Sequence, residues 1–352
     1  MRAVVLEEYG EPLAVADRPK PGPDPDGVVV ETLACGICRS DWHAWQGHGE
    51  WVDDRVPRGQ ILGHEPVGRV REAGERVDSV AVGDRIVAPF NLADGTCPAC
   101  RRGRTNYCEG ATALGFGPDA PGAFAEYFHV PRADVNAVAL PESVSSVAAA
   151  SLGCRFVTAF EALDAVADVG AGETVVIVGC GGVGLSAVQV ADALGGTAVA
   201  VDVRERPLEM AAEMGAAETV NASEVEDVPG RIEAMTGGAD VSMDALGSAE
   251  TCRTAIDSLS GDGVHVQVGL TGDADRGEIP VPMDTVVQDG LSIRGSRGMP
   301  PARYDDLFEL IERGRVDPEA LVTDTVSLDD VPDRLAAMSD FGVLGVEVVT
   351  EF

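Results

Sequence analysis

The chain has 352 residues, of which 45% are apolar, and a formal net charge of −33 at pH 7. This length predicts two domains of ordinary size, and the negative charge disfavours nucleic acid and anionic membranes as partners. The sequence opens without a basic, apolar leader and contains no long apolar run, so we expect a soluble, cytoplasmic protein.

The acidic residues are spread along the whole chain, and Lys20 is the single lysine among 26 basic residues. Self-repulsion of this size destabilises a compact state in dilute buffer, whereas molar salt screens it. The pattern is similar to that of proteins from salt-accumulating haloarchaea. An ordinary acidic enzyme from a GC-rich genome is the alternative.

Short β-like runs alternate with turns over roughly the first 150 residues. Runs at 28–30, 66–70 and 84–88 are rich in valine and isoleucine, and glycine and proline separate them. Because helical periodicity is weak, this part is predicted to be an irregular, mostly β domain covering residues 1–154.

The character of the sequence changes near residue 148, where a helix is expected over 147–167. Strands and helices then alternate, at 174–178, 183–194, 197–201, 208–214, 241–244 and 263–268. This alternation predicts an α/β domain with a doubly wound parallel sheet over residues 155–294. The final segment, 295–352, is expected to contain a helix at 304–312 and a strand at 346–349.

A glycine-rich turn follows the strand expected at 174–178. Residues 179–184 read Gly-Cys-Gly-Gly-Val-Gly and open a helix, and Asp202 ends the next strand 18 residues later. This context is typical of a dinucleotide site, with the helix N-terminus facing the phosphates. A glycine-rich turn in a non-binding domain is the alternative. The candidate cofactor contacts in this half are Gly179, Gly181, Gly182, Val183, Gly184, Asp202, Arg204 and Val268.

The expected cofactor is NAD, because Asp202 can accept hydrogen bonds from ribose hydroxyls and repels a 2′-phosphate. Arg204 and Arg206 follow closely and could bind that phosphate, so NADP is the alternative.

Residues 35–43, Cys-Gly-Ile-Cys-Arg-Ser-Asp-Trp-His, are dense in metal-ligating and proton-handling groups. A thiolate from this segment, the imidazole of His64 and the thiolate of Cys154 would make a Cys₂His zinc site with an open position. The residue types alone leave an alternative to zinc binding for each residue. His64 could be a hydrogen-bonded core histidine, and Cys154 could be a buried apolar residue of the core. The tryptophans Trp42, Trp45 and Trp51 either line a pocket near this site or only pack.

A second cluster places three cysteines within twelve residues, preceded by an aspartate. Its members are Asp94, Cys97, Cys100 and Cys108. The spacing predicts a structural zinc with the aspartate as an oxygen ligand. A carboxylate in place of a thiolate weakens a site of soft ligands, so a metal-free loop is the alternative.

With these motifs in order, the chain resembles the medium-chain, zinc-dependent alcohol dehydrogenase family over nearly its full length. The matching segments are Met1-Arg2-Ala3-Val4-Val5, residues 36–41, Gly63-His64-Glu65-Pro66-Val67-Gly68, residues 82–87 and the loop 100–108. The resemblance implies that the irregular domain is a GroES-like barrel and that residues 295–352 return to it. Two features depart from the family pattern, the aspartate at 94 and the segment 295–300.

The resemblance also implies roles for individual residues. It makes Cys38, His64 and Cys154 the catalytic zinc ligands and Glu65 a carboxylate that can replace one of them. Asp41 would orient the ligand imidazole, Arg39 would contact the pyrophosphate, and Phe90 would form a wall of the substrate pocket. Ser40 and His43 would form a proton relay from a zinc-bound alkoxide through the cofactor ribose to solvent.

The function expected is therefore reversible hydride transfer between a primary or secondary alcohol, or its aldehyde, and a nicotinamide dinucleotide, in a homo-oligomer of two or four subunits. A polyol or sugar dehydrogenase would use the same machinery, but its sugar-specific members often carry a carboxylate in place of Cys154. A dinucleotide-binding protein without zinc chemistry is a further alternative. His48, His129 and His265 have no partner that the sequence identifies, so they are interpreted as structural or surface residues.

Overall fold

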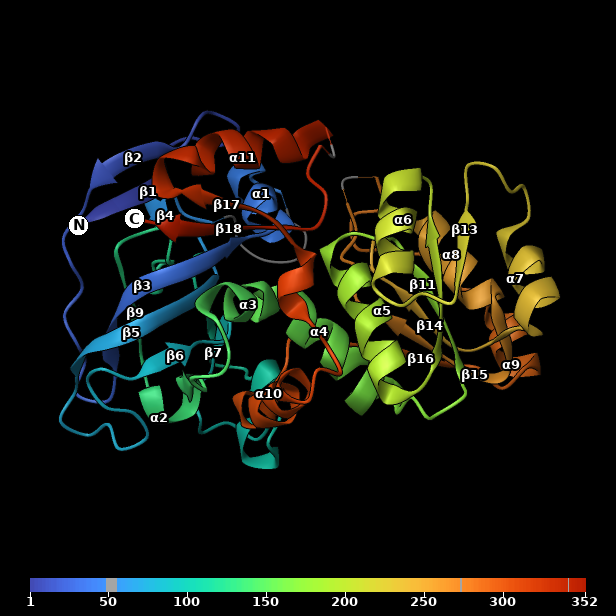
Figure 1. Cartoon of the computed structure of the whole chain (residues 1–352), viewed down its shortest axis with the longest axis horizontal. Coiled ribbons are helices and arrows are strands. Elements are labelled where there is room, and N and C mark those ends of the chain that lie inside the picture. Colours follow the sequence, from blue (N-terminus) through green and yellow to red (C-terminus); the bar gives the residue numbers. More distant parts are fainter. Residues whose placement is uncertain (49–55, 273, 341) are drawn as a thin grey trace. The chain divides into compact units, whose positions relative to one another are not determined.

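The computed structural model describes residues 1–48, 56–272, 274–340 and 342–352. They form two compact units, one of Met1–Val157 with Gly298–Phe352 and the other of Thr158–Arg297 (Figure 1). The junctions lie three residues beyond those placed by the sequence analysis at 154 and 294.

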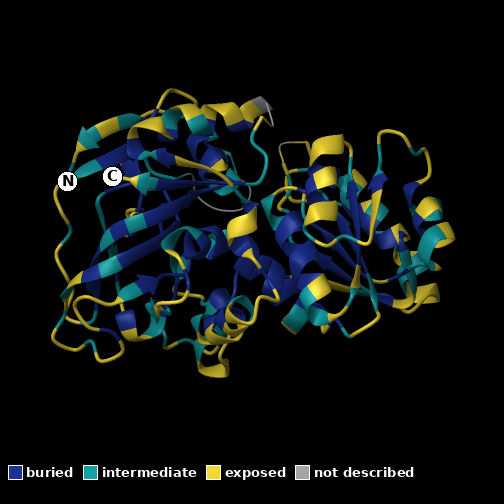
Figure 2. Ribbon diagram, in the orientation of Figure 1, coloured by how far each residue is buried: buried dark blue, intermediate teal, exposed yellow. Residues whose placement is uncertain are grey.

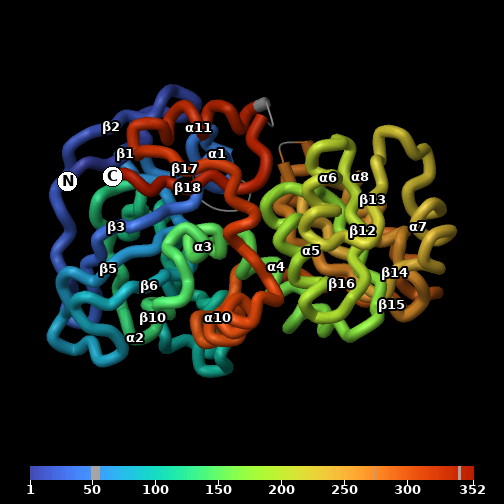
Figure 3. The backbone as a smooth tube through the Cα atoms, viewed as in Figure 1, coloured from blue at the N-terminus to red at the C-terminus, as the bar shows by residue number. Residues whose placement is uncertain are grey.

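The first unit is built around a seven-stranded, mostly antiparallel sheet of order β10-β6-β5-β3-β18-β17, with β9 also paired to β3. Its strands are β3 (Val28–Ile37), β5 (Glu65–Ala73), β6 (Arg85–Val87), β9 (Tyr127–Val130), β10 (Val138–Ala139), β17 (Val322–Ser327) and β18 (Val346–Glu351). Figure 3 shows the C-terminal segment running among the N-terminal strands, and β18 pairs antiparallel with β3.

Smaller elements complete this unit. The strands β2, β1 and β4 form one sheet, and β7 pairs with β8. Their bounds are β1 (Arg2–Leu6), β2 (Ala14–Asp17), β4 (Gln60–Ile61), β7 (Asn91–Leu92) and β8 (Thr112–Ala113). The helices are α1 (Arg39–Gln46), α2 (Ala133–Asn136), α3 (Ser146–Ser151), α10 (Tyr304–Glu312) and α11 (Val331–Ala337). Because Trp42 and Trp45 of α1 join the apolar core, that helix is anchored directly after β3.

The second unit carries a six-stranded sheet of order β13-β12-β11-β14-β15-β16, in which every pairing is parallel. Its strands are β11 (Thr174–Val178), β12 (Thr197–Asp202), β13 (Glu218–Asn221), β14 (Ala239–Asp244), β15 (Leu259–Gln267) and β16 (Ser292–Gly295). Its helices are α5 (Gly182–Leu194), α6 (Glu205–Glu213), α7 (Val228–Thr236), α8 (Ala249–Asp257) and α9 (Met283–Gln288). The predicted doubly wound α/β fold is confirmed, with its topological switch between β11 and β14. Figure 2 shows the central strands almost wholly buried.

The helix predicted at 147–167 differs from the observed one. After α3 the chain forms a π-helical turn over Leu152–Phe156, with non-helical backbone at Gly153, before α4 (Val157–Phe160) and a second π-helical stretch, Glu161–Ala167. Such turns interrupt α-helices and are frequent at functional sites. The span Ser146–Ala167 is long and apolar enough to cross a membrane, but 78% of its apolar window is buried, which is typical of a core helix.

Several elements have no counterpart among the predicted ones. They include α1, β13, α7, α8, β16, β17 and α11. These segments are short or mix charged and apolar residues, so their hydrophobic periodicity is weak. The helix predicted at 208–214 begins earlier, at Glu205, and its first two residues, Glu205 and Arg206, are charged and exposed, so they added nothing to the apolar pattern.

Candidate metal centre and cofactor edge

Pairing between β3 and β5 brings together two segments that lie far apart in the sequence. The strands are antiparallel, and Gly36 is the register partner of Glu65. Cys38 follows the end of β3 as the N-cap of α1, and His64 directly precedes β5. The sheet therefore places Cys38 beside His64 and Glu65.

Cys154 reaches the same place from the π-helical turn after α3. A Cβ added at Gly36 would collide with Glu65 Oε2, and a Cβ added at Gly153 would collide with Glu65 Cβ and Cγ. These two glycines therefore allow the backbone of the turn and of β3 to close around the Glu65 side chain. Neither position has room for a larger residue.

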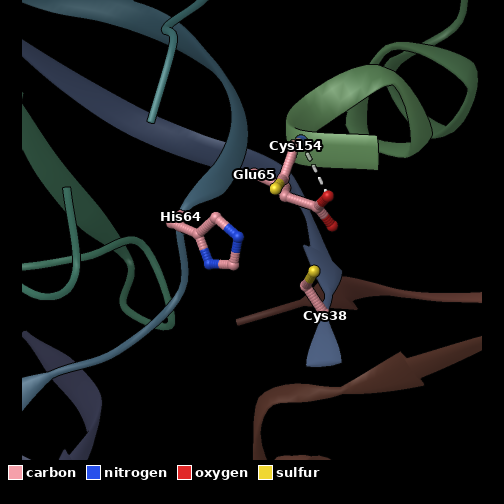
Figure 4. Close-up of side chains that lie close together, drawn as sticks. All are labelled: Cys38, His64, Glu65 and Cys154. Atoms are coloured by element: carbon pink, nitrogen blue, oxygen red, sulfur yellow. Dashed lines mark hydrogen bonds between the residues drawn. The ribbon is translucent and has the colours of Figure 1, made fainter. Parts of the chain in front are cut away.

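Figure 4 shows the side chains of Cys38, His64, Glu65 and Cys154 pointing toward one another. Their potential ligand atoms all lie within 4.8 Å of one another. His64 Nε2 is buried and has no hydrogen-bond partner. One imidazole nitrogen and two thiol sulfur atoms are ligands that zinc prefers, and a buried nitrogen without a hydrogen-bond partner calls for one. These residues therefore fit a zinc ion.

Asp41 fixes the orientation of the His64 ring. Its side chain is fully buried, and its Oδ1 atom lies 2.9 Å from His64 Nδ1. The same carboxylate accepts hydrogen bonds from the backbone N–H groups of Gly63, at 3.0 Å, and Cys38, at 3.1 Å. Because Nδ1 donates to Asp41, Nε2 is the nitrogen left free to bind a metal.

Arg155 is the ion-pair partner of Glu65. One oxygen of Glu65 forms a buried ion pair with Arg155, and the other accepts a hydrogen bond of 2.8 Å from Cys154 N. Arg155 also donates to Ile37 O at 3.1 Å. Sequence reasoning gave Arg155 no role, although a charged residue beside a candidate ligand in an apolar helix was a usable signal.

Burial and neighbouring charges shift the pKa values at this centre. Burial raises the pKa of Glu65 to about 7, against the opposing effect of Arg155. Hydrogen bonding from Cys154, and then the charge of Arg155, lower the pKa of Cys38 well below its usual range despite burial. A thiolate is therefore favoured at Cys38, and the thiolate is the form that binds metal.

The candidate relay residues lie on α1. Ser40 Oγ is 3.9 Å from Cys38 Sγ, and His43 is exposed, with its Nδ1 atom 3.2 Å from Nδ1 of His48. Arg39 donates to Met338 O and stacks on the ring of Trp42 at 3.9 Å.

Two aromatic rings border His64. Phe90 lies edge-on at 6.1 Å between ring centroids, and Phe116, which sequence reasoning missed, lies at 4.7 Å. The indoles of Trp42 and Trp45 are buried and donate to Ser339 Oγ and Glu11 O, so both pack in the core. Trp51 lies outside the described residues.

The second cluster also converges. The ligand atoms of Asp94, Cys97, Cys100 and Cys108 lie within 4.8 Å of one another, and all three cysteines are free thiols. Cys97 Sγ and Cys100 Sγ are 3.5 Å apart, and Asp94 Oδ1 accepts from the backbone N–H groups of Thr96 and Cys97. These backbone bonds lower the pKa of Asp94 to about 2, which keeps it ionised. An ionised carboxylate among three thiols fits a tetrahedral zinc ion.

The glycine-rich turn lies at the carboxyl edge of the parallel sheet. Gly179 adopts a left-handed conformation, with φ of 95°, directly after β11. A Cβ at Gly184 would collide with Gly179 O, whereas one at Gly181 would meet only open space. The turn is thus closed toward the sheet and open on its outer side, as pyrophosphate binding requires.

Asp202 is tied to this turn. Its Oδ2 atom accepts a hydrogen bond of 2.9 Å from Cys180 N, and its Oδ1 atom accepts from the backbone N–H of Arg204 at 3.0 Å. The Arg204 side chain lies against the same oxygen, with Nε at 3.4 Å. Arg206 is exposed, and Val268 follows β15 at the same edge.

Comparison with known proteins gives concordant matches. A family described as "Alcohol dehydrogenase GroES-like domain" matches residues 24–142, and one described as "Zinc-binding dehydrogenase" matches residues 182–313. An alcohol dehydrogenase of Geobacillus stearothermophilus is 34% identical over 95% of this chain and 96% of its own, and an NAD-dependent alcohol dehydrogenase of Sulfurisphaera tokodaii is 33% identical over 99% of both. The solved alcohol dehydrogenase from Thermus sp. ATN1 superimposes with a TM-score of 0.90 at 31% identity, covering both chains fully.

Proposed function

Because the chain belongs to the medium-chain, zinc-dependent alcohol dehydrogenase family, we propose that it interconverts primary or secondary alcohols with their carbonyl compounds. It is an oxidoreductase with zinc and a nicotinamide dinucleotide as cofactors. The observation that carries the proposal is the buried, unpaired Nε2 atom of His64 between the thiols of Cys38 and Cys154.

These three residues would hold the catalytic zinc, which when bound supplies a Lewis acid that polarises the substrate oxygen. Asp41 keeps the His64 ring in the tautomer and orientation that present Nε2. Arg155 and the backbone of Cys154 hold the Glu65 carboxylate beside the ligands. Glu65 is thereby available as an additional oxygen ligand when a position is vacated.

The proton of the alcohol is assigned to residues of α1. Ser40 Oγ, close to Cys38, would accept it while passing its own hydroxyl proton through the cofactor ribose to His43, whose exposed ring would release a proton to solvent. The exposure of His43 supports this order, because a terminal group must exchange protons with water.

The second unit would hold the dinucleotide, which accepts the hydride, along the carboxyl edge of its sheet. Gly181 leaves room for the pyrophosphate, and the N-terminus of α5 faces it. Asp202 would accept from the ribose hydroxyls, which favours NAD, while Arg204 beside it would admit some NADP.

We further propose a simple alcohol rather than a sugar as substrate, because Cys154 supplies a thiolate where sugar-specific relatives often have a carboxylate. The cluster at Asp94 would bind a structural zinc. The net charge of −33 supports a halophilic enzyme working in concentrated salt. A panel of alcohols, diols and sugars assayed at high salt separates these substrate classes.

The ligand assignment is tested with Cys154→Ser. Turnover and one zinc equivalent should be lost, while NADH binding persists because the dinucleotide edge belongs to the other unit. Cys35→Ala is the matched control, since Cys35 is a buried thiol in β3 outside both clusters. A Cys154→Ser enzyme that retains zinc and wild-type turnover would show that the assignment is wrong.

A further inference from the structure

A row of polar side chains, three of them buried, crosses two neighbouring strands of the parallel sheet, outside the contacts assigned above. Ser242 and Asp244 lie on β14, and their register partners on β15 are His265 and Gln267. Ser242, Asp244 and His265 are fully buried. Residues two apart on a strand share a face, so the four side chains form one continuous row.

Hydrogen bonding along this row has a single direction. Gln267 Nε2 donates to Asp244 Oδ2 at 2.9 Å and to Gly269 O at 2.8 Å. Both partners can only accept, so the amide orientation is fixed and Gln267 Oε1 must accept. It lies 3.1 Å from His265 Nε2, which is therefore the protonated ring nitrogen.

The other ring nitrogen completes the row. His265 Nδ1 lies 3.0 Å from Ser242 Oγ, so the hydroxyl donates to it. Cys252 Sγ, 3.8 Å from His265 Nε2, adds a weak acceptor at the same N–H. Burial lowers the pKa of His265, which favours the neutral ring that this pattern requires. The row thus runs from the Ser242 hydroxyl to the Asp244 carboxylate.

Asp244 connects the row to the carboxyl edge of the sheet. Its Oδ1 atom accepts from the backbone N–H groups of Leu246, at 2.9 Å, and Gly247, at 3.0 Å. Its main-chain oxygen accepts from the N–H groups of Val268 and Gly269. One residue therefore fixes the loops that follow both β14 and β15.

These two loops lie beside the glycine-rich turn. A Cβ added at Gly179 would be 3.3 Å from Leu246 Cβ, and a Cβ added at Gly247 would be 2.6 Å from Gly269 C. The loops are thus packed against each other, and the loop after β14 adjoins the topological switch, where doubly wound folds bind their ligands.

We propose that Gln267 and His265 are positioning residues for the dinucleotide. Through Asp244 they hold the 246–247 and 268–269 loops in the binding conformation before the cofactor arrives, which removes an ordering cost from binding. This inference rests on the proposed function for its ligand, but the hydrogen-bond row is a property of the free protein.

The first experiment uses Gln267→Leu, which removes the donors to Asp244 Oδ2 and Gly269 O. The Kd for NADH, measured by fluorescence titration of the zinc-loaded protein, should rise about tenfold, the equivalent of losing one net hydrogen bond to a charged group. Val266→Ala is the control, because Val266 is fully buried on the opposite face of β15. It should lower the unfolding midpoint without changing the Kd.

Two substitutions at His265 distinguish a positioning role from simple packing. His265→Gln retains a donor toward Gln267 and an acceptor toward Ser242, so NADH affinity should stay near wild type, whereas His265→Leu should weaken it as Gln267→Leu does. If both His265 variants bind NADH equally, or if Gln267→Leu binds within twofold of wild type, the proposal is overturned.

Two measurements on the free protein keep this test independent of the proposed function. In Gln267→Leu the amides of Leu246 and Gly247 should exchange with deuterium at least tenfold faster than in wild type. Nitrogen-15 NMR should show His265 protonated at Nε2, its signals being identified as those missing in His265→Gln. If the wild-type protein binds no NADH, the proposed function is refuted but the hydrogen-bond row is not. Unchanged amide exchange in Gln267→Leu, or protonation of His265 at Nδ1, would refute the proposed positioning role.

Discussion

Asp41 Oδ1 lies 2.9 Å from Nδ1 of His64, and both side chains are completely buried. This contact decides which nitrogen of the ring faces Cys38 and Cys154. Three donors from two separate segments of the chain converge on the same carboxylate, so its orientation is itself fixed. The centre is thus arranged by the fold before any metal binds.

Replacing Asp41 by asparagine should weaken zinc binding at this centre by about 10- to 100-fold, the usual cost of losing a hydrogen-bonding partner behind a metal ligand. An amide presents one acceptor where the carboxylate presents two, and its NH₂ opposes the Cys38 or Gly63 N–H. Zinc transfer to a chelating dye measures the change. Asp134→Asn is the control, since Asp134 also accepts from two backbone N–H groups, those of Asp78 and Ser79. Equal zinc retention in both variants would contradict the expectation.

The central features of the fold could be predicted from the sequence because they depend on local pattern. The apolar run at Thr174–Val178, the glycine-rich turn and α5 have strong periodicity and turn chemistry. In contrast, α1 is eight residues long and is stabilised by burying Trp42 and Trp45 in a core assembled from distant strands. Tertiary packing of that kind leaves no periodic signal.

The same distinction between local pattern and tertiary packing applies to the candidate site. Residue types suggested a thiolate from residues 35–43 together with His64 and Cys154, and the family resemblance selected Cys38. The register of β3 with β5 is what makes Cys38 and His64 neighbours. Phe116 was missed because its significance depends only on what it contacts, whereas Arg155 was missed although its charge beside Cys154 in an apolar helix was a usable signal. His265 had no partner that the sequence could name, since Ser242 and Gln267 become its neighbours through parallel strand pairing.

The cluster at Asp94 gives a prediction of stoichiometry. The purified protein should contain two zinc ions per chain, one of them lost in Cys97→Ser without a direct effect on the catalytic centre. Asp94→Cys should retain that ion more tightly, because a thiolate is a softer ligand than a carboxylate. Metal analysis by mass spectrometry checks this. One zinc per chain with full activity would mean that the cluster is a metal-free loop.

The acidic surface gives a prediction about salt. With a net charge of −33, the unfolding midpoint and the activity should both rise steeply with KCl and level off near molar concentration, where the Debye length is about 3 Å. Thermal unfolding across a KCl series measures the effect, and an equal osmolality of sucrose is the control. Full stability in dilute buffer would exclude the halophilic interpretation.

Two histidines, His265 fully buried and His129 partly buried, give a prediction about pH. Burial lowers the pKa of both His129 and His265 from the ordinary 6.5, so the unfolded chain takes up their protons first as the pH falls. Stability is therefore unaffected by these groups above pH 6.5 and declines as the pH falls from 6.5 toward their folded pKa values. His265→Gln should flatten this decline between about pH 5 and 7 relative to wild type. Urea midpoints at constant molar salt compare the two, and parallel curves would show that His265 does not contribute.

The last prediction concerns the choice between NAD and NADP. The Asp202 side chain is only 8% exposed and already accepts hydrogen bonds from Cys180 N and from the backbone of Arg204. A carboxylate has lone pairs left for ribose hydroxyls, and its charge opposes a 2′-phosphate. We therefore expect NAD to be preferred, with measurable use of NADP, since molar salt screens the repulsion.

Asp202→Gly should shift the ratio of kcat/KM values toward NADP for two reasons. It removes the negative charge, and it releases the Arg204 side chain from its contact at 3.4 Å. The variant also loses the bond to Cys180 N, so both absolute efficiencies should fall and only their ratio is diagnostic. Asp202→Gly combined with Arg204→Ala separates the causes, because the shift should shrink if the released guanidinium binds the phosphate. A native enzyme that prefers NADP tenfold or more would show that Arg204 already outweighs Asp202.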